Sequence, residues 1–443
     1  MRAVHGWLPA VVPAGARRFR VADDELAAAL AEAGAELVDS EPDVEIAFAG
    51  SDLRGDGRLA IVTVVGPASR AGPSLVRAAR RAAHSLRARL VAARARRLLR
   101  RRGYDDVSVL YWDLPDRVRL PGLTEDGPRL PRYALAIGRR GAREPTAVES
   151  ALGAASDDLE ASWASTRAGL VVLAVNGSLL RVAIGPTRAE IDNSAASLAA
   201  LRAASPPPEV SDRVPWPVSR GRVGLADWSL ESLLRGTQPS REVSDPLYAD
   251  CLAFLAALGG LRGGLAETHS FSALADTVEE VCRPETSTAL RLVANRLERR
   301  LVEVPRCFAH GDFFAGNLLV DEAGRLSGVV DWDAAGPGRL PLLDLLHLEL
   351  TRSGPFADVD WGRALLERLV PLARAGGDEG IARYCSELGL SADRSLLEAL
   401  VFAYWLDYAA YQLRAHPVRR VQPAWIEGNI ELVVPSAANA LTE

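Results

Sequence analysis

The sequence predicts an α+β protein of 443 residues in three parts: a small α/β domain (1–142), a small β-rich lobe (143–238) and a larger helical lobe (239–443). Three observations lead to this prediction. Apolar runs typical of buried strands alternate with helical spacing in the first part, an Asn-Gly turn joins two apolar runs in the second, and apolar residues recur every three or four residues in the third. The length suits about three domains and is ample for buried cores.

In the first part, residues 23–33 have helical apolar spacing, and Gly34 is well placed to end that helix. Apolar runs at 44–49, 59–65 and 107–112 are typical of buried strands. The order of these elements resembles the C-terminal half of a class I methyltransferase fold. However, no strand followed by a Gly-x-Gly loop occurs within the first forty residues, so we expect a non-catalytic α/β domain.

A basic helix is expected at 73–103, with Pro73 placed to start it and Gly103 to end it. This segment holds only arginines as charged residues, whereas the net charge of the whole chain is −5, so charge is segregated along the sequence. Three interpretations compete: a face that is solvated or docked on an acidic neighbour, a peripheral contact with an anionic membrane, and a nucleic-acid contact. We favour the first, and expect no nucleic-acid partner because no aromatic residues are interleaved with the arginines.

The second part begins with helical spacing at 146–163. Apolar runs at 169–175 and 178–184 flank the Asn-Gly turn and predict a β-hairpin. A helix is expected at 188–204, followed by two short strands within 218–228. The third part has helical spacing at 250–259, 273–300, 363–375 and 395–414.

The clearest chemical signal lies between residues 307 and 333. His310, Gly311 and Asp312 form a tight turn in an apolar segment, which we expect to be a hairpin with Asn317 in its loop, and a further apolar run ends at Asp331. Phosphoryl transfer needs such groups: a carboxylate that positions the attacking hydroxyl and takes its proton, and an amide and a second carboxylate that hold Mg²⁺. The spacing Asp-x-x-x-x-Asn is that of a phosphotransferase catalytic loop.

These motifs give the chain its resemblance to a known family. His-Gly-Asp-x-x-x-x-Asn at 310–317, Asp-Trp-Asp at 331–333 and a Gly-Pro-Asp-Leu-like segment at 338–345 resemble the aminoglycoside phosphotransferase and choline kinase-like family. The resemblance covers 143–443 and implies a two-lobed protein-kinase-like fold. It also implies ATP-dependent transfer of the γ-phosphate to a hydroxyl of a small molecule such as a sugar, an aminoglycoside or an amino alcohol.

The resemblance further assigns roles to individual residues. Asp312 is the expected catalytic base, His310 is expected to brace the catalytic loop, and Asp344 is expected to anchor it. Mg²⁺ is expected on Asn317 and Asp331, with Asp333 acting through a water molecule. The family also places a phosphate-binding basic residue at Arg181 and the adenine beside Leu233 and Leu234, in a segment (229–236) that crosses between the lobes.

The sequence departs from the family in its second part. The chain contains no lysine, so an arginine stands where kinases usually place a lysine, and no glycine-rich loop precedes the hairpin. Ser194 occupies the place of the expected ion-pairing glutamate, which leaves Glu190 as a substitute. These departures favour an alternative function: a pseudokinase-like module that binds a nucleotide or a partner, with the N-terminal domain supplying the function.

Two further expectations concern the acceptor and the surroundings of the protein. Trp405, Asp407, Tyr408 and Tyr411 cluster on the last long helix, where they either line an acceptor pocket or belong to the core. The four cysteines lack the spacing of a zinc site or of a disulfide framework, and no signal peptide or membrane-spanning run is evident. We therefore expect a cytoplasmic protein, and the sequence leaves its oligomeric state open.

Overall fold

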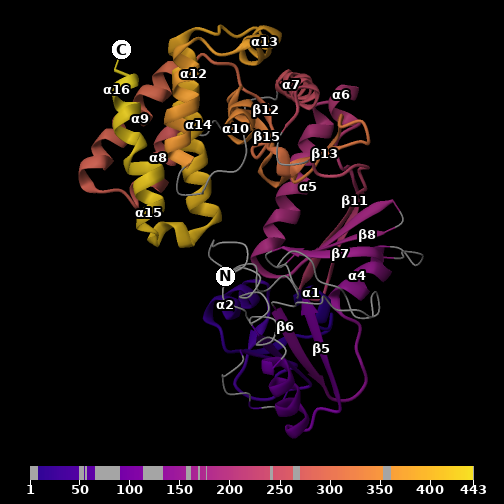
Figure 1. Ribbon diagram of the computed structural model, residues 1–443. Helices are drawn as coiled ribbons and strands as arrows, with labels where there is room; N and C mark the ends of the chain where they lie inside the picture. The colour runs from indigo at the N-terminus through magenta and orange to yellow at the C-terminus, as the bar shows by residue number, and fades with distance from the viewer. Residues whose placement is uncertain are drawn as a thin grey trace. The chain divides into compact units, whose positions relative to one another are not determined.

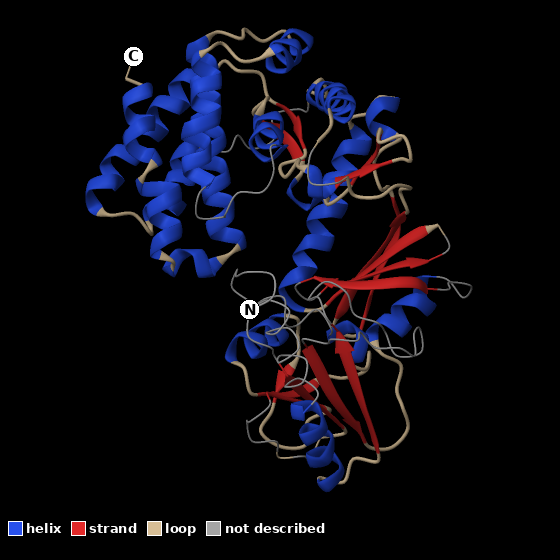
Figure 2. Cartoon of the chain, viewed as in Figure 1, coloured by secondary structure: helices blue, strands red, loops and turns tan. Residues whose placement is uncertain are grey.

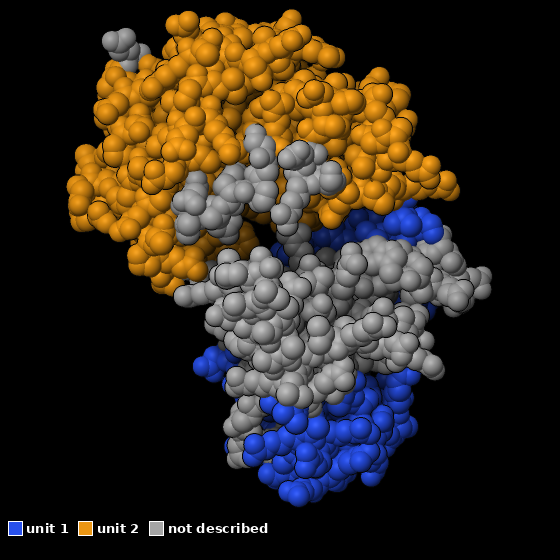
Figure 3. Space-filling model, in the orientation of Figure 1, with its two compact units in different colours: residues 1–192, 216–233 blue, residues 193–215, 234–443 orange. Residues whose placement is uncertain are grey.

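The computed structural model describes residues 8–48, 54, 57–64, 90–112, 133–155, 161–167, 170–175, 177–239, 243–262, 270–352 and 361–442. The chain forms two compact units (Figure 3). Unit 1 contains residues 1–192 and 216–233, and unit 2 contains residues 193–215 and 234–443. The first part expected from the sequence and most of the second therefore lie together in unit 1.

Unit 1 contains a six-stranded sheet with the order β2-β1-β3-β4-β6-β5 (Figure 1). Its strands are β1 (Arg18–Val21), β2 (Glu36–Leu37), β3 (Val44–Phe48), β4 (Leu59–Val64), β5 (Asp106–Trp112) and β6 (Tyr133–Arg139). The first four strands are parallel, and β6 inserts antiparallel between β4 and β5. The strands expected at 44–49, 59–65 and 107–112 are confirmed as β3, β4 and β5. The resemblance to a methyltransferase stays a prediction.

The first predicted helix is also confirmed, as α2 (Asp24–Glu32). It begins after Asp23, whose carboxylate accepts a hydrogen bond of 2.7 Å from the backbone N–H of Leu26. Gly34 follows its end with a φ of +96°, a conformation that glycine adopts without steric cost. Local capping chemistry therefore fixes both ends of this helix.

A second, antiparallel sheet has the order β10-β11-β9-β8-β7. Its strands are β7 (Ala161–Arg167), β8 (Leu170–Val175), β9 (Ser178–Ala183), β10 (Pro217–Val223) and β11 (Ala226–Ser232). The β8–β9 pairing confirms the expected hairpin. The helix expected at 146–163 ends early, as α4 (Ala147–Ala155), and Trp163 lies in β7. Pairing of β7 with β8 is a tertiary interaction that overrides the helical spacing of this segment.

One hydrophobic core joins the two sheets of unit 1. Phe19 and Ile61 of the first sheet, Leu180 and Trp228 of the second, and Val148 of α4 belong to the same cluster of buried side chains, as do residues of the short helix α1 (Leu8–Val11). Burying one large apolar side chain stabilises a fold by about 1.5–3 kcal/mol. The first 142 residues therefore complete the core on which the second sheet rests.

Removing residues 1–142 is accordingly expected to unfold the rest of unit 1. The contacts that would be lost involve several fully buried side chains. Their summed contribution to the free energy of unfolding is comparable with the typical net stability of about 5–15 kcal/mol. Circular dichroism and thermal denaturation of the 143–443 fragment and of the full chain would test this. A fragment whose strand content and melting profile match those of the full chain would contradict it.

Unit 2 is mostly helical, and two small sheets lie among its helices (Figure 2). Helix α5 (Arg188–Ala203) runs from unit 1 into it. Its further helices are α6 (Pro208–Ser211), α7 (Asp245–Gly259), α8 (Phe271–Glu279), α9 (Pro284–Leu301), α10 (Leu343–Arg352), α11 (Trp361–Ala364), α12 (Val370–Arg374), α13 (Glu379–Leu388), α14 (Arg394–Ala415), α15 (Pro423–Ile426) and α16 (Val433–Ala440). The segment 273–300 is not one helix, because Pro284 starts α9 and lacks the N–H that a helix interior needs.

The small sheets of unit 2 correct one expectation. The segment 307–320 was expected to be a hairpin, yet β12 (Cys307–Ala309) pairs with β15 (Gly336–Arg339), and β13 (Leu318–Val320) pairs with β14 (Leu326–Val329). The two apolar runs therefore belong to different sheets. The loop between β12 and β13 is consequently held by tertiary contacts rather than by a hairpin ladder.

Only the second half of the basic segment falls within the described residues, as a helix at 90–101. Arg94, Arg97 and Arg101 are exposed there, and no ion pair involves them within the described part of the chain. The start expected at Pro73 lies outside the described residues, and contact with an anionic membrane stays a prediction. Among the helices that the structure describes, none combines the length and the apolar character needed to cross a bilayer.

Candidate active site

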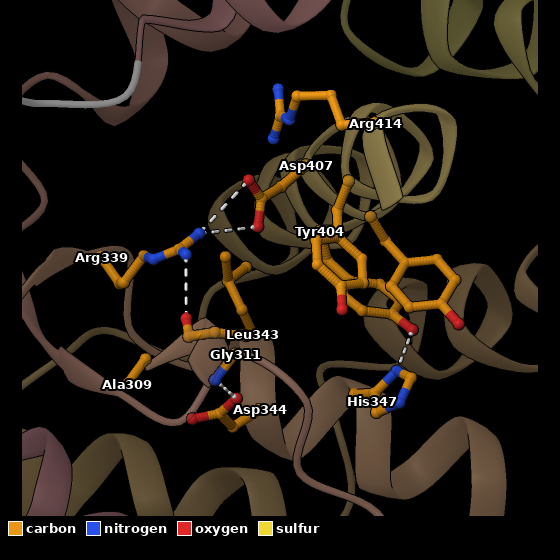
Figure 4. A pocket seen from close by; sticks show the side chains of 12 residues that line it. Ala309, Gly311, Arg339, Leu343, Asp344, His347, Tyr404, Asp407 and Arg414 are labelled. Atoms are coloured by element: carbon orange, nitrogen blue, oxygen red, sulfur yellow. Dashed lines mark hydrogen bonds and ion pairs between the residues drawn. The ribbon is translucent and has the colours of Figure 1, made fainter. Parts of the chain in front are cut away.

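The loop that follows β12 is held by the carboxylate of Asp344 at the start of α10. The backbone N–H groups of His310 and Gly311 donate to its two oxygens at 2.6 and 2.8 Å, and Figure 4 shows the second of these bonds. Because ionic acceptors make the stronger hydrogen bonds, the carboxylate fixes the turn at both N–H groups. The structure thus confirms that Asp344 anchors the loop, as expected from the sequence.

Gly311 allows the turn that presents Asp312. Its φ is +84°, and a Cβ atom at this position would lie 2.4 Å from the carbonyl oxygen of Ala334. We expect Gly311→Ala to destabilise the loop by about 1–3 kcal/mol and to lower turnover strongly. Gly324→Ala is the matched control, because Gly324 has a φ of +74° but nothing within 4 Å of its Cβ position. Equal effects of both variants on activity and melting temperature would contradict the prediction.

His310 supports this loop through hydrogen bonds of its side chain. Its side chain is fully buried, Nε2 lies 3.0 Å from the carbonyl oxygen of Val330, and the backbone N–H of Asp312 points at Nδ1 over 3.4 Å. A carbonyl only accepts, so Nε2 carries the hydrogen and Nδ1 is the acceptor. The ring packs edge-on against Trp332 with centroids 4.8 Å apart. Every polar atom of the imidazole is thereby used within the protein, which agrees with the expected bracing role.

Asp312 and Asn317 are joined by a short local network. The side-chain amide of Asn317, in the turn η3 (Ala315–Asn317), donates to the carboxylate of Asp312 at 3.1 Å and to its backbone carbonyl at 2.9 Å. This fixes the orientation of the buried amide, whose oxygen accepts no hydrogen bond from the described residues. The Asp312 side chain is 24% exposed. The pair therefore offers an accessible carboxylate beside an amide oxygen that is free to bind a cation.

Asp331 follows β14 and has a left-handed backbone conformation, with a φ of +70°. Such a conformation in a residue other than glycine costs about 1–3 kcal/mol and is concentrated at functional sites. Asp333 lies two residues on, in the turn η4 (Trp332–Ala334). Burial raises the pKa of Tyr411, and the charges of Asp312, Asp333 and Asp331 raise it further. The phenol of Tyr411 is therefore influenced by all three carboxylates.

The donor set suits Mg²⁺ better than a transition metal. Within the described residues no group of three His, Cys, Asp or Glu side chains converges as a metal site. Magnesium typically uses one or two carboxylates and takes its other oxygen ligands from water and phosphates. The free amide oxygen of Asn317 and the carboxylate of Asp331 fit that requirement, because both are oxygen donors.

A hollow that is partly open to solvent lies against this loop (Figure 4). One wall is formed by α14, which contributes Tyr404, Asp407, Tyr408, Tyr411 and Arg414. The remaining lining residues are Ala309, Gly311, Ala334, Arg339, Leu343, Asp344 and His347. Its mixture of aromatic faces with a few polar groups is typical of a site for a small molecule.

The cluster expected on the last long helix divides between pocket and core. Asp407, Tyr408 and Tyr411 line the hollow, whereas Trp405 is fully buried and donates to the backbone carbonyl of Asn429 at 2.8 Å. The carboxylate of Asp407 is paired with Arg339 at 3.2 Å. A cationic acceptor would therefore have to compete with that arginine for Asp407.

The residues expected at the nucleotide lie partly in unit 1. Arg181 on β9 is buried and pairs with Glu231 on β11 at 3.7 Å, and the hydroxyl of Ser229 also donates to Glu231. The backbone N–H of Leu233 donates to the carbonyl oxygen of Gly177 at 3.0 Å, also within unit 1. Leu234 begins the next stretch of unit 2. Residues 229–232 belong to β11, so the crossing segment is shorter than expected.

Sequence analysis missed two residues close to the expected base. Nε2 of His347 lies 3.6 Å from a carboxylate oxygen of Asp312, and Tyr404 bonds to the other imidazole nitrogen. One signal was present in the sequence: His347 stands three residues after Asp344 in an apolar helix, a spacing that places both on one face. Glu231, the partner of Arg181, carried no such signal, because register alone brings β11 beside β9.

This chain is similar to several solved structures. The complex of aminoglycoside phosphotransferase APH(3'')-Id from Streptomyces rimosus with ADP and streptomycin has 17% sequence identity and a TM-score of 0.39, and the match covers 58% of this chain and 95% of that one. Choline kinase LicA from Streptococcus pneumoniae has 12% identity and a TM-score of 0.41 over 66% of this chain and 97% of that one. No curated protein matches the sequence.

The sequence itself matches one family model, described as the phosphotransferase enzyme family, over residues 170–369. That range starts at β8 and includes the anchored loop, Asn317, Asp331 and α10, but not α14. The family expected from the sequence is thus matched over this part of the chain, and the expected mixture of helices and strands is confirmed. Residues 170–369 are therefore similar to the phosphotransferase enzyme family.

Proposed function

We propose that the protein transfers the γ-phosphate of ATP to a hydroxyl group of a small molecule bound beside Asp312. One observation carries the proposal: the partly exposed carboxylate of Asp312 is held by the amide of Asn317 at 3.1 Å, and it lies next to a hollow with aromatic walls. A positioned carboxylate beside a small-molecule pocket is what an alcohol phosphotransferase needs.

The carboxylate of Asp312 orients the acceptor hydroxyl and takes its proton as the oxygen attacks the γ-phosphorus. A new P–O bond forms, the bond between the γ-phosphorus and the bridging oxygen breaks, and the products are a phosphate ester and ADP. Asn317 keeps the carboxylate in place through its N–H group, while Asp344 and His310 hold the loop backbone. Positioning and charge stabilisation provide most of the rate enhancement in this type of reaction.

Mg²⁺ would be held by the amide oxygen of Asn317 and by Asp331, with Asp333 acting through water. When bound, the ion would supply positive charge that offsets the negative charge developing on the transferred phosphate. The role of Arg181 toward the phosphates and the placement of the adenine beside Leu233 and Leu234 stay predictions. The pairing of Arg181 with Glu231 is compatible with a role of Arg181 at the phosphates. In kinases, too, the phosphate-binding basic residue is usually held by a carboxylate.

The proposal is tested by measuring phosphate transfer from γ-labelled ATP with MgCl₂, using the full chain. The acceptors should span charge as well as shape: streptomycin and choline as cations, glucose and glycerol as neutral compounds, and homoserine as a zwitterion. The Asp312→Asn variant provides the blank. Transfer that is absent from the blank supports the proposal. Nucleotide binding without transfer to any acceptor would favour the pseudokinase-like alternative.

A further inference from the structure

Three side chains from three helices form a line behind Asp312. The indole N–H of Trp361 on α11 donates to the hydroxyl of Tyr404 on α14 at 3.3 Å, and this hydroxyl lies 2.7 Å from Nδ1 of His347 on α10. Nε2 of His347 faces Asp312, 3.6 Å from its carboxylate. Figure 4 shows the bond between His347 and Tyr404 at the edge of the hollow. Trp361, Tyr404 and His347 are all buried.

The direction of these bonds follows from what each group is able to donate. An indole N–H only donates, so the oxygen of Tyr404 is its acceptor. That hydroxyl has one hydrogen of its own, and Nδ1 of His347 is its sole acceptor among the described residues. Nδ1 is therefore unprotonated, and a neutral imidazole in this position carries its hydrogen on Nε2. We assign the tautomer from this network, and it directs an N–H group at the carboxylate of Asp312.

The surroundings of His347 keep the ring neutral. Burial lowers its pKa and is the largest effect; the charges of Asp312 and Asp344 oppose it, and His310 adds to it. The other groups packed against the ring are aromatic: Phe314 with a centroid distance of 5.9 Å and Tyr408 at 5.1 Å. A neutral donor leaves the negative charge of the carboxylate in place, and therefore leaves it able to accept a proton.

We propose that His347 is a positioning residue for the catalytic base: it donates from Nε2 to Asp312, and Tyr404 and Trp361 hold it in the required tautomer. This inference rests on the proposed function, in which Asp312 accepts the proton of the acceptor. With Asn317 donating to one carboxylate oxygen and His347 facing the other, both oxygens are oriented. The separation of 3.6 Å shortens to a hydrogen bond when substrates bind, as catalytic bonds commonly do.

A purely structural histidine is the competing interpretation, and two variants separate it from the proposal. Glutamine at position 347 offers an amide N–H near the place of Nε2, whereas leucine fills the volume without a donor. We expect His347→Leu to lower kcat roughly 10- to 100-fold with KM for ATP unchanged, because misplacement of a reacting group costs about that much. His347→Gln should recover most of the loss. The kcat of Tyr404→Phe should lie between those of His347→Leu and His347→Gln, because this substitution removes the hydrogen bond that fixes the tautomer of His347.

The control is Tyr104→Phe in unit 1, which also removes a buried tyrosine hydroxyl, in this case one that donates to the carbonyl oxygen of Gly57. Its kcat should equal that of the unaltered chain. Equal losses in the leucine and glutamine variants, or a kcat within about twofold of the unaltered chain for the leucine variant, would overturn the positioning role. Absence of transfer by the unaltered chain to every acceptor of the panel would instead overturn the proposed function, and the catalytic part of the inference with it.

A spectroscopic measurement tests the tautomer without any turnover. In the full chain labelled with ¹⁵N-histidine, the signals of residue 347 are identified by their absence in His347→Gln. We expect a protonated Nε2 and an unprotonated Nδ1 at neutral pH, and a change of the Nδ1 shift in Tyr404→Phe. Protonation at Nδ1 in the unaltered chain would overturn the assignment, whether or not an acceptor has been found.

Discussion

Asp312→Asn is expected to lower kcat about 10²–10⁴-fold, because an amide has no basic oxygen to take the proton of the acceptor hydroxyl. The isosteric side chain keeps the loop geometry, which is fixed through Asp344 and Gly311 rather than through the carboxylate of Asp312. Nucleotide affinity and melting temperature should therefore remain close to those of the unaltered protein. Steady-state kinetics with labelled ATP, together with thermal denaturation of the same preparations, measures both.

Asp321→Asn is the control for this substitution. Asp321 is a carboxylate in the turn between β13 and β14, and among the described residues its oxygen accepts hydrogen bonds from two backbone N–H groups, each at 2.9 Å. It should leave kcat unaffected. If Asp312→Asn retained kcat within a fewfold of the unaltered chain, Asp312 would not be the base, and positioning by Asn317 and the loop would have to account for the reaction.

Trp405→Ala is expected to destabilise unit 2 by about 3–5 kcal/mol, the usual cost of deleting a buried tryptophan. The side chain is fully buried in α14, and its indole N–H satisfies the carbonyl oxygen of Asn429 at 2.8 Å. For a unit of this size the change corresponds to a fall of roughly 6–20 °C in melting temperature. Thermal denaturation followed by tryptophan fluorescence and circular dichroism measures it.

Trp405→Phe keeps most of the apolar volume and removes only the indole hydrogen bond, so its cost should be about 1–3 kcal/mol. A graded series, with alanine worse than phenylalanine, identifies a core residue. A different pattern, in which the melting temperature is unchanged and KM for the acceptor rises, would place Trp405 in the acceptor site and would contradict the burial found here.

The candidate reacting groups could be predicted from the sequence because they lie close together along the chain. Asp312 and Asn317 are five residues apart, and a single turn of 3₁₀ helix is enough to bring the amide onto the carboxylate. Asp331 could be predicted equally well, because a carboxylate that follows an apolar run is expected at the end of a strand. Phosphoryl transfer constrains the residue types and their spacing within one short segment. Such a pattern can be recognised in a single sequence. The helix after Asp23 and the hairpin that contains Arg181 could be predicted for the same reason.

The remaining features depend on contacts between segments that are distant along the chain. His347 and Tyr404 are 57 residues apart, so no spacing rule relates them. The pairing of β12 with β15 instead of β13, and that of Arg181 with Glu231, follow from strand register. On α14, Trp405 enters the core while Tyr408 faces the hollow.

The sequence by itself therefore predicted which groups would carry out the chemistry and indicated the family that residues 170–369 match. Only the tertiary structure decided how those groups are held: which histidine faces Asp312, and which aromatic residues of α14 line the hollow. The physical reason lies in the burial of α14, which is apolar around most of its circumference. A helix packed on nearly every side shows no periodicity that marks one face as functional, and long-range packing alone selects the residues that line the site.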